Sequence, residues 1–246
     1  MNIASSYKIE QDLLAQHFTK GDYKAEFNGH AACVAYALRY GIKTAFDTWS
    51  LLKKGPIHHK VGNITILGGG CAFELPVMMH FLKDHNKELH VKVIDPISRW
   101  RIFQPMHVRM AQKMGIRLHL EFVPAMDVLE QVDSYKTDLL VSFNSLTELS
   151  FGERKALRIA YDNCKRHLFW HSSLTVMQEV FGSSYVPMRD DLQFHPEAQL
   201  TRTLANRFPK LAEMNVFANL GRKGFYLMHN LSQVKKEDAL TWIHKY

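Results

Sequence analysis

The sequence predicts an α/β protein with a doubly wound, mostly parallel sheet and a helical extension at its N-terminus. Two observations carry this prediction. From residue 61 onward, apolar strand-like runs alternate with helix-like segments, which is typical of parallel strands joined by right-handed crossovers. The last two strand-like runs are separated only by residues 220–223, and so short a connection indicates an antiparallel hairpin. We therefore divide the chain into a helical extension or lid, 1–60, and an α/β domain, 61–246.

The helical extension is predicted from the spacing of apolar residues. Residues 7–18 have amphipathic spacing, and 31–52 form a longer apolar segment in which Gly41 predicts a break. The sequence Lys-Lys-Gly-Pro at 53–56 ends this segment, because glycine and proline both stop helices.

Seven strands are expected in the α/β domain. They are Ile64–Leu67, Val91–Ile94, Leu118–Phe122, Leu139–Phe143, Leu168–His171, Val216–Asn219 and Gly224–His229. Helices are expected between the first five strands, at Phe73–His85, between Arg99 and Met114, at Met126–Val132 and at Gly152–Cys164. Pro105 is expected to open the main part of the second helix and Gly115 to stop it, because proline suits a first helical turn and glycine a helix end.

Composition limits the kinds of partner. No apolar run approaches the ~20 residues that a membrane span needs, and the first residues carry no signal-peptide apolar region. Three scattered cysteines fit a reducing compartment, so a cytoplasmic protein without membrane contact is expected. The formal net charge is +7, and cations gather at 99–117 and 202–223. These stretches indicate either a polyanion-binding face, for example for RNA, or merely solvated charge.

The run Ile64-Thr-Ile-Leu-Gly-Gly-Gly70 is the most informative motif. An apolar strand leads into three glycines and then into a helix, and such a turn lets a ligand approach the backbone beside a helix N-terminus. Asp95 ends the next strand, where a carboxylate can accept the hydroxyls of a ribose. The motif therefore predicts a nucleoside-containing cofactor. A dinucleotide site would need a third glycine where Phe73 stands, which argues against a nicotinamide cofactor.

This order of elements resembles the class I S-adenosylmethionine-dependent methyltransferases over roughly residues 61–231. The resemblance implies a seven-stranded sheet whose reversed last strand forms a hairpin, with S-adenosylmethionine as the cofactor. It implies that Gly68, Gly69, Gly70 and Cys71 hold the methionine end of the cofactor and that Asp95 holds the ribose. Met126 and Asp127 would contact the adenine, and Asn144 and Ser145 would lie near the methyl group. The sequence departs from the family pattern at Ile66 and Ala72, where an acid and a glycine are usual.

The sequence identifies the residues that would act on the methyl acceptor less definitely than those that would bind the cofactor. The catalytic candidates are Asn144, Glu148 and His171, although Asn144 also suits a turn and Glu148 a capping box with Ser145. Asp127 is equally a helix cap, and Asp95 alternatively caps the turn before Pro96. Substrate-binding candidates are Tyr36, Tyr40, Arg99, Arg101 and Tyr185. No histidine or cysteine spacing indicates a metal site, so none is predicted.

Three hypotheses for function follow. The first is a methyltransferase that acts on RNA, which the basic stretches favour. The second is a small-metabolite methyltransferase that uses the N-terminal helices as a lid. The third is a catalytically inactive methyltransferase-like binding module, which the departures at Ile66 and Ala72 favour.

Overall fold

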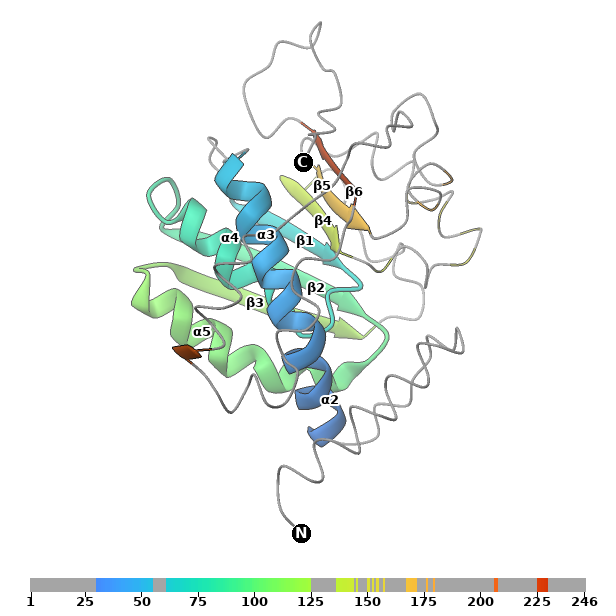
Figure 1. Ribbon diagram of the computed structural model, residues 1–246. Helices are drawn as coiled ribbons and strands as arrows, with labels where there is room; N and C mark the ends of the chain where they lie inside the picture. The colour runs from blue at the N-terminus through green and yellow to red at the C-terminus, as the bar shows by residue number, and fades with distance from the viewer. Residues whose placement is uncertain are drawn as a thin grey trace, which may run out of the picture.

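A computed structural model describes 30–54, 61–124, 136–143, 145, 150, 152, 154, 157, 167–171, 176, 179, 206–207 and 225–229. In these residues a single sheet carries helices on one of its faces (Figure 1). None of the described helices is long and apolar enough to cross a membrane.

The sheet has six described strands in the order β3-β2-β1-β4-β5-β6. The strands are β1 Asn63–Leu67, β2 Glu88–Asp95, β3 Arg117–Pro124, β4 Leu139–Phe143, β5 His167–His171 and β6 Phe225–His229. Neighbouring strands from β3 to β5 are parallel, whereas β6 runs antiparallel to β5. The chain leaves β1 toward β2 on one side and returns to β4 on the other. The carboxyl ends of β1 and β4 therefore flank the crevice where open α/β sheets bind ligands.

The five predicted parallel strands are confirmed within a few residues at their ends. The predicted strand Val216–Asn219 lies outside the described residues, so the seventh strand and the hairpin stay predictions. The predicted helix Met126–Val132 also lies outside them. Of the predicted helix Gly152–Cys164, residues 152, 154 and 157 are described and are helical.

The helices before β4 form where apolar spacing predicts them. They are α2 His30–Tyr36, a π-helical turn Ala37–Gly41, α3 Ile42–Lys54, α4 Glu74–Leu82, a 3₁₀ turn Ser98–Phe103 and α5 Gln104–Lys113. Pro105 lies in the first turn of α5, and Gly115, with φ +71°, follows the end of that helix, as predicted. The predicted break at Gly41 is wrong, because the chain continues as one helical column through the π-helical turn.

Gly41 has a packing role in that column. A Cβ atom added at Gly41 would lie 2.8 Å from the Cys71 Sγ atom and 2.8 Å from the Phe73 ring. Glycine therefore lets the helical column approach the loop between β1 and α4 closely, and the π-helical turn marks the point of contact.

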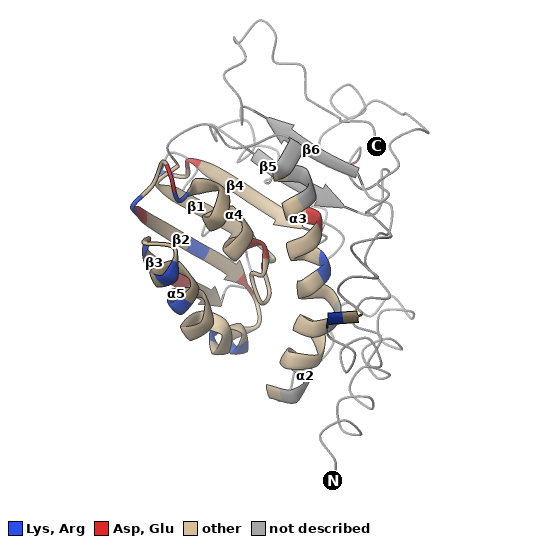
Figure 2. Ribbon diagram, turned by 60° about the vertical axis from the view of Figure 1, so that its left-hand side comes forward, with Lys and Arg blue, Asp and Glu red and all other residues tan. Residues whose placement is uncertain are grey.

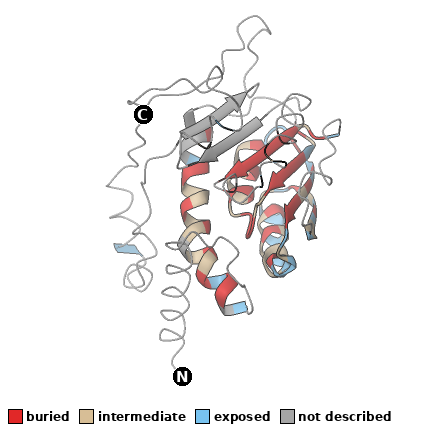
Figure 3. Ribbon diagram, turned by 90° about the vertical axis from the view of Figure 1, so that its right-hand side faces the viewer, coloured by how far each residue is buried: buried red, intermediate tan, exposed pale blue. Residues whose placement is uncertain are grey.

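The main core lies between the sheet and α4. Alternate residues of β1, β2 and β4 point to this face, and the fully buried side chains of α4 cover them, namely Leu75, Met78, Met79 and Leu82. Leu52 of α3 and Ala111 of α5 join the same cluster. Figure 3 shows how the buried residues concentrate in the central strands. This packing holds the carboxyl ends of β1 and β2, and so the glycine loop, in fixed positions.

The opposite face of the sheet is polar at the amino ends of β2 and β3. Exposed and buried residues alternate along the first half of β2, and β3 alternates in the same way. A cavity of about 490 Å³ lies on this face, lined among others by Thr65, His90, Lys92, His119 and Glu121. Parallel strands that are buried on both faces would instead be apolar throughout.

Candidate functional site

The glycine loop joins the end of β1 to α4 and consists of residues 68–72. Gly68, Gly70 and Ala72 have φ values of +56°, +50° and +52°, so alternate positions of the loop are left-handed. The Gly68 N–H donates to the Ile94 carbonyl at 2.8 Å, and the Ala72 N–H donates to the Gly69 carbonyl at 2.7 Å. Ala72 is the one described non-glycine residue with positive φ, as expected from its place in the motif.

The three glycines of the loop are needed for different reasons. A Cβ atom at Gly68 would lie 2.3 Å from the Ser145 Cβ atom, and one at Gly69 would lie 2.7 Å from the Ile66 Cγ2 atom. A Cβ atom at Gly70 would meet nothing closer than 3.7 Å, where the rings of Tyr36 and Trp100 lie. Gly68 and Gly69 therefore allow tight packing below the loop, whereas Gly70 is buried against two aromatic rings at ordinary contact distance, and it is its positive φ that favours glycine.

Asp95 ends β2 and binds the glycine loop directly. Its Oδ2 atom accepts a hydrogen bond from the Gly70 N–H at 3.0 Å. Its Oδ1 atom accepts bonds from the Ile97 N–H and the Trp100 Nε1–H, both at 2.9 Å. Asp95 thus links the loop, β2 and the 3₁₀ turn. Because a carboxylate oxygen can accept two hydrogen bonds, Oδ2 retains capacity for one more donor, such as a ribose hydroxyl.

The electrostatics of Asp95 are set by its burial. Only 8% of the residue is exposed, and desolvation raises the pKa of its carboxyl to about 6, although the three hydrogen bonds favour the ionised form. The group is therefore mostly ionised at pH 7, which is the form that accepts hydrogen bonds on both oxygens.

Two predicted substrate-binding residues lie beside the loop. The rings of Tyr36 and Trp100 are 5.2 Å apart between centroids, and those of Tyr36 and Tyr40 are 4.9 Å apart. The structure thus brings the Tyr36 ring to Gly70 and the Tyr40 ring to Tyr36, while their role in binding stays a prediction. Arg99 and Arg101 lie exposed in the 3₁₀ turn that follows β2.

Ser145 and Cys71 have structural contacts that the sequence does not reveal. The Ser145 hydroxyl donates to the Leu67 carbonyl at 3.0 Å and lies 2.6 Å from the Ser142 hydroxyl, so it closes the space below Gly68. The Cys71 carbonyl accepts a hydrogen bond from the His107 Nε2 atom at 2.8 Å. Burial raises the pKa of the Cys71 thiol well above its usual range, so the thiol is neutral. The cofactor contacts expected of both residues stay predictions.

For the other predicted site residues, the described part of the structure gives no contact with the glycine loop. Met126, Asp127, Asn144, Glu148 and Tyr185 lie outside the described residues. His171 is the last residue of β5, and only its place in that strand is described.

Sequence reasoning missed two buried titratable groups next to the loop. Glu74 begins α4 and is 2% exposed, and burial raises the pKa of its carboxyl to about 8, so it is mostly protonated at neutral pH. His107 of α5 is fully buried, and desolvation lowers its pKa, so the ring is neutral. Its Nδ1 atom has no hydrogen-bond partner among the described residues. The sequence gives little sign of this burial, because an acid in the first turn of a helix is common and is explained by the helix dipole.

Comparison with known proteins finds similarity among solved structures only. No family model matches the chain, and no curated protein sequence matches it. An S-adenosylmethionine-dependent methyltransferase from Aquifex aeolicus is 13% identical, with a TM-score of 0.42 over 75% of this chain and 89% of the other. An O-methyltransferase family protein from Burkholderia thailandensis is 14% identical, with a TM-score of 0.48 over 85% of this chain and 61% of the other.

A third solved structure is a phosphoethanolamine N-methyltransferase from Haemonchus contortus, in complex with phosphoethanolamine and S-adenosylhomocysteine. It is 16% identical, with a TM-score of 0.41 over 70% of this chain and 33% of the other. The chain is thus similar to solved methyltransferases over 70–85% of its length in these three comparisons.

Proposed function

We propose that the chain is an S-adenosylmethionine-dependent methyltransferase whose glycine loop and Asp95 bind the cofactor. The observation that carries the proposal is the loop itself, in which three alternate positions are left-handed and Asp95 binds Gly70 at the end of β2. This loop lies at the switch point of a sheet in which β6 runs antiparallel to β5. A reversed last strand is what the sequence resemblance implies.

The residues present fit such a cofactor. Gly70 and Trp100 are buried, but the Tyr36 residue beside them is partly exposed, so an adenosine could pack against the Tyr36 ring. Asp95 keeps one acceptor position on Oδ2, and the first turn of α4 adds the positive end of a helix. The bound cofactor would supply a methyl group on a sulfonium, which is already activated for transfer.

The main contribution of the protein would then be to position the methyl acceptor. Transfer from an activated donor needs the acceptor held in line and water kept away, and it needs a general base only if the acceptor is protonated. We expect Tyr36 and Tyr40, whose rings lie 4.9 Å apart, to form part of the acceptor pocket. Asn144, Glu148 and His171 remain the candidates for contact with the reacting group.

For the acceptor, we favour RNA. Five cations of the stretch 99–117 are exposed, namely Arg99, Arg101, Arg109, Lys113 and Arg117. Arg99 and Arg101 lie in the 3₁₀ turn after Asp95, whereas Arg117 begins β3 at the other end of the sheet. Figure 2 shows Lys and Arg along α5. Arg207 of the second basic stretch is exposed as well. Contacts between such side chains and phosphates would make RNA binding steeply salt-dependent, whereas no binding at low salt would favour a small-metabolite acceptor.

Calorimetry with S-adenosylmethionine and S-adenosylhomocysteine tests the cofactor. We expect saturable binding of both, and we expect Gly70→Ala to weaken it by at least about ten-fold, because the added methyl group would strain the left-handed backbone whose N–H binds Asp95. Gly115→Ala is the matched control, since Gly115 also has positive φ but no atom within 4 Å of an added Cβ. Both substitutions cost about 1–2 kcal/mol of backbone strain, so only Gly70→Ala should change affinity.

Asp95→Ala tests the ribose contact, with an expected loss of about 1–3 kcal/mol in binding. Because Asp95 also binds Trp100, Trp100→Phe serves as its control: it removes the indole donor and leaves the carboxylate. No binding of either ligand at millimolar concentration would overturn the proposal and favour the binding-module hypothesis.

A further inference from the structure

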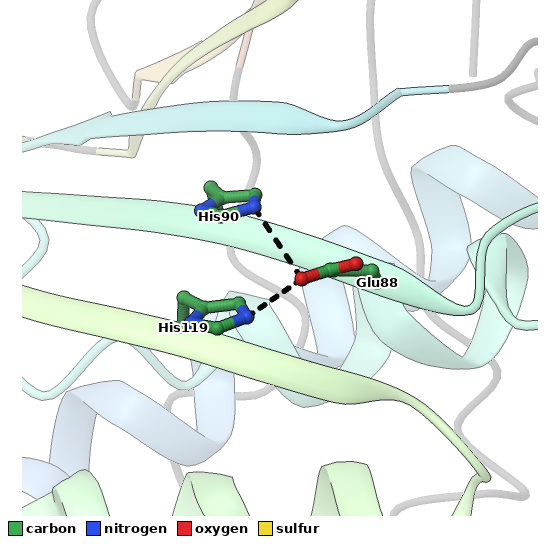
Figure 4. Close-up of side chains that lie close together, drawn as sticks. All are labelled: Glu88, His90 and His119. Carbon is green, nitrogen blue, oxygen red and sulfur yellow. Dashed lines mark hydrogen bonds and ion pairs between the residues drawn. The ribbon is translucent and has the colours of Figure 1, made fainter.

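A cluster of three metal-ligating side chains lies on the polar face of the sheet, away from the glycine loop. The His/Glu cluster consists of Glu88 and His90 of β2 and His119 of β3 (Figure 4). One potential ligand atom from each residue lies within 4.8 Å of the others. All three side chains are about half exposed, at 47%, 56% and 49% in the order given, so a solvated ion can reach them.

The register of the sheet creates the cluster. His90 and His119 are directly paired across β2 and β3, and their rings stack at 4.4 Å between centroids with an interplanar angle of 5°. Glu88 lies two residues before His90 and so points to the same face. Its Oε1 atom is 2.8 Å from the His119 Nε2 atom and 3.7 Å from the His90 Nε2 atom.

We propose that the His/Glu cluster is a binding site for a divalent transition-metal ion, with Zn²⁺ bound by the two imidazoles and the carboxylate. Two nitrogens and one oxygen are a ligand set that suits zinc, and three protein ligands leave a fourth position for water. Magnesium and calcium prefer oxygen ligands, so the two imidazoles select against them.

The separations between the ligand atoms of the His/Glu cluster are close to those of a zinc site. Zinc–ligand distances of about 2.0–2.1 Å place two tetrahedral ligand atoms roughly 3.4 Å apart. The Glu88 and His119 atoms are already closer than that, and the His90 atom is slightly farther. The two rings are nearly parallel, so they must rotate before both Nε2 lone pairs point at one ion, and their half-exposed positions leave room for that rotation.

The surroundings provide room for the fourth ligand. The cavity of about 490 Å³ is lined by both histidines, so water or a small anion can complete the coordination from this side. Lys92 and Lys136 also line the cavity, and Arg117 is paired with Glu88 in the sheet. The positive charges of these side chains repel a Zn²⁺ ion that carries only neutral water, but they would attract an anion as its fourth ligand.

The site is separate from the proposed cofactor site. His90 and Asp95 lie on the same strand five residues apart, which corresponds to roughly 17 Å at about 3.3 Å per residue. The ion would therefore take no part in methyl transfer. It would instead link the amino ends of β2 and the edge-lying β3, on the side of the sheet away from α4.

Calorimetry and thermal unfolding of the full chain with Zn²⁺ alone test the proposal. We expect one ion to bind per chain, to raise the melting temperature, and to bind at least about ten-fold more weakly to His90→Ala or His119→Ala. Glu88→Gln keeps the shape of the side chain and its ability to accept a bond from His119 but removes the charge, so it too should weaken Zn²⁺ binding. Mg²⁺ should give neither heat nor stabilisation.

His85→Ala is the matched control, because His85 is exposed next to the end of α4 and outside the cluster. The chain has 14 histidines, so this variant separates the cluster from non-specific imidazole binding. Equal Zn²⁺ affinity in wild type, His90→Ala and His119→Ala, or no one-to-one binding below about 100 μM, would overturn the proposal. Cobalt substitution gives a further check, since a tetrahedral site would produce visible absorption bands that His119→Ala lacks.

Discussion

The backbone at Gly68 depends on the absence of a side chain. A Cβ atom there would lie 2.3 Å from the Ser145 Cβ atom, and Ser145 is held by its bond to the Leu67 carbonyl. We expect Gly68→Ala to lower the free energy of unfolding by more than about 3 kcal/mol, because overpacking adds to left-handed strain. Urea denaturation measures this, with Gly115→Ala, expected to cost about 1–2 kcal/mol, as the reference. Equal losses in the two variants would contradict the packing argument.

Ala72 occupies a left-handed position that glycine fills in the related motif. Ala72→Gly removes about 1–2 kcal/mol of strain but loses a buried methyl group and adds chain entropy, each worth about 0.5–1 kcal/mol. We therefore expect its free energy of unfolding to stay within about 1 kcal/mol of wild type. Ala111→Gly is the comparison, because Ala111 is equally buried in a regular helix, where the same change costs about 2 kcal/mol. Similar losses at both positions would mean that Ala72 is unstrained.

The two departures from the methyltransferase pattern have different physical meanings. Ala72 keeps the loop conformation at the expense of strain, so its backbone still has the shape that the motif requires. Ile66 is fully buried in the main core and packs against the position of Gly69, so it belongs to the hydrophobic packing of β1. Sequence alone shows both departures but cannot separate a strained backbone from a core position, because that depends on φ and on neighbours distant in the chain.

Helix α3 contains a buried ion pair between Lys43 and Asp47, which lie one helical turn apart. We expect Lys43→Met to lower the free energy of unfolding by about 3–5 kcal/mol, because it leaves a buried carboxylate without its partner. The double variant Lys43→Met with Asp47→Leu should recover most of this loss. Urea denaturation of the three proteins at pH 7 provides the measurement. A double variant as unstable as Lys43→Met would show that the helix needs the charges themselves.

Apolar spacing predicts the elements better than their junctions. Runs such as Leu139–Phe143 are apolar throughout because β4 is buried in the sheet, and so they read clearly as strands. The junction at Gly41 reads as a break because glycine disfavours helices, whereas packing against Cys71 keeps it helical. The His/Glu cluster escapes sequence analysis for a related reason. Its residues are spread from 88 to 119, and only the register of β2 and β3 brings them together.

At the scale of the whole molecule, buried carboxyls make stability depend on pH. Burial raises the pKa of Glu74 to about 8 and that of Asp95 to about 6. A group whose pKa is higher in the folded state stabilises the fold fully below its unfolded value, and that stability is lost as pH rises through the folded value. The free energy of unfolding should therefore fall from about pH 4 to about pH 8, by up to about 1.4 kcal/mol per pH unit for each group between its unfolded and folded pKa values.

Glu74→Gln isolates one of these groups. The amide cannot ionise, so the decline in stability between pH 6 and pH 8 should be much smaller in this variant than in wild type. Denaturant unfolding at half-unit pH intervals would reveal the difference. Parallel pH profiles for the two proteins would show that Glu74 is already ionised in the folded state.

The overall architecture is also the part that sequence predicts most fully. Alternation of strands and helices predicts the parallel sheet, and the glycine loop and Asp95 are predicted as neighbours from their strand-end positions alone. The use of Asp95 to hold Trp100 and Gly70 is not predictable in this way, because it depends on how the 3₁₀ turn after β2 folds back toward the loop.

The contact between Trp100 and Asp95 has an optical consequence. Trp100 is 2% exposed, donates its indole N–H to the carboxylate and lies beside the ring of Tyr36, whereas Trp49 is 39% exposed. The emission of Trp100 is therefore set by a buried environment beside a carboxylate, and we expect a ligand that binds next to Tyr36 to change it. Trp100 thus serves as a fluorophore next to the proposed cofactor loop, and the difference in emission between wild type and Trp100→Phe would separate its signal from that of the other three tryptophans.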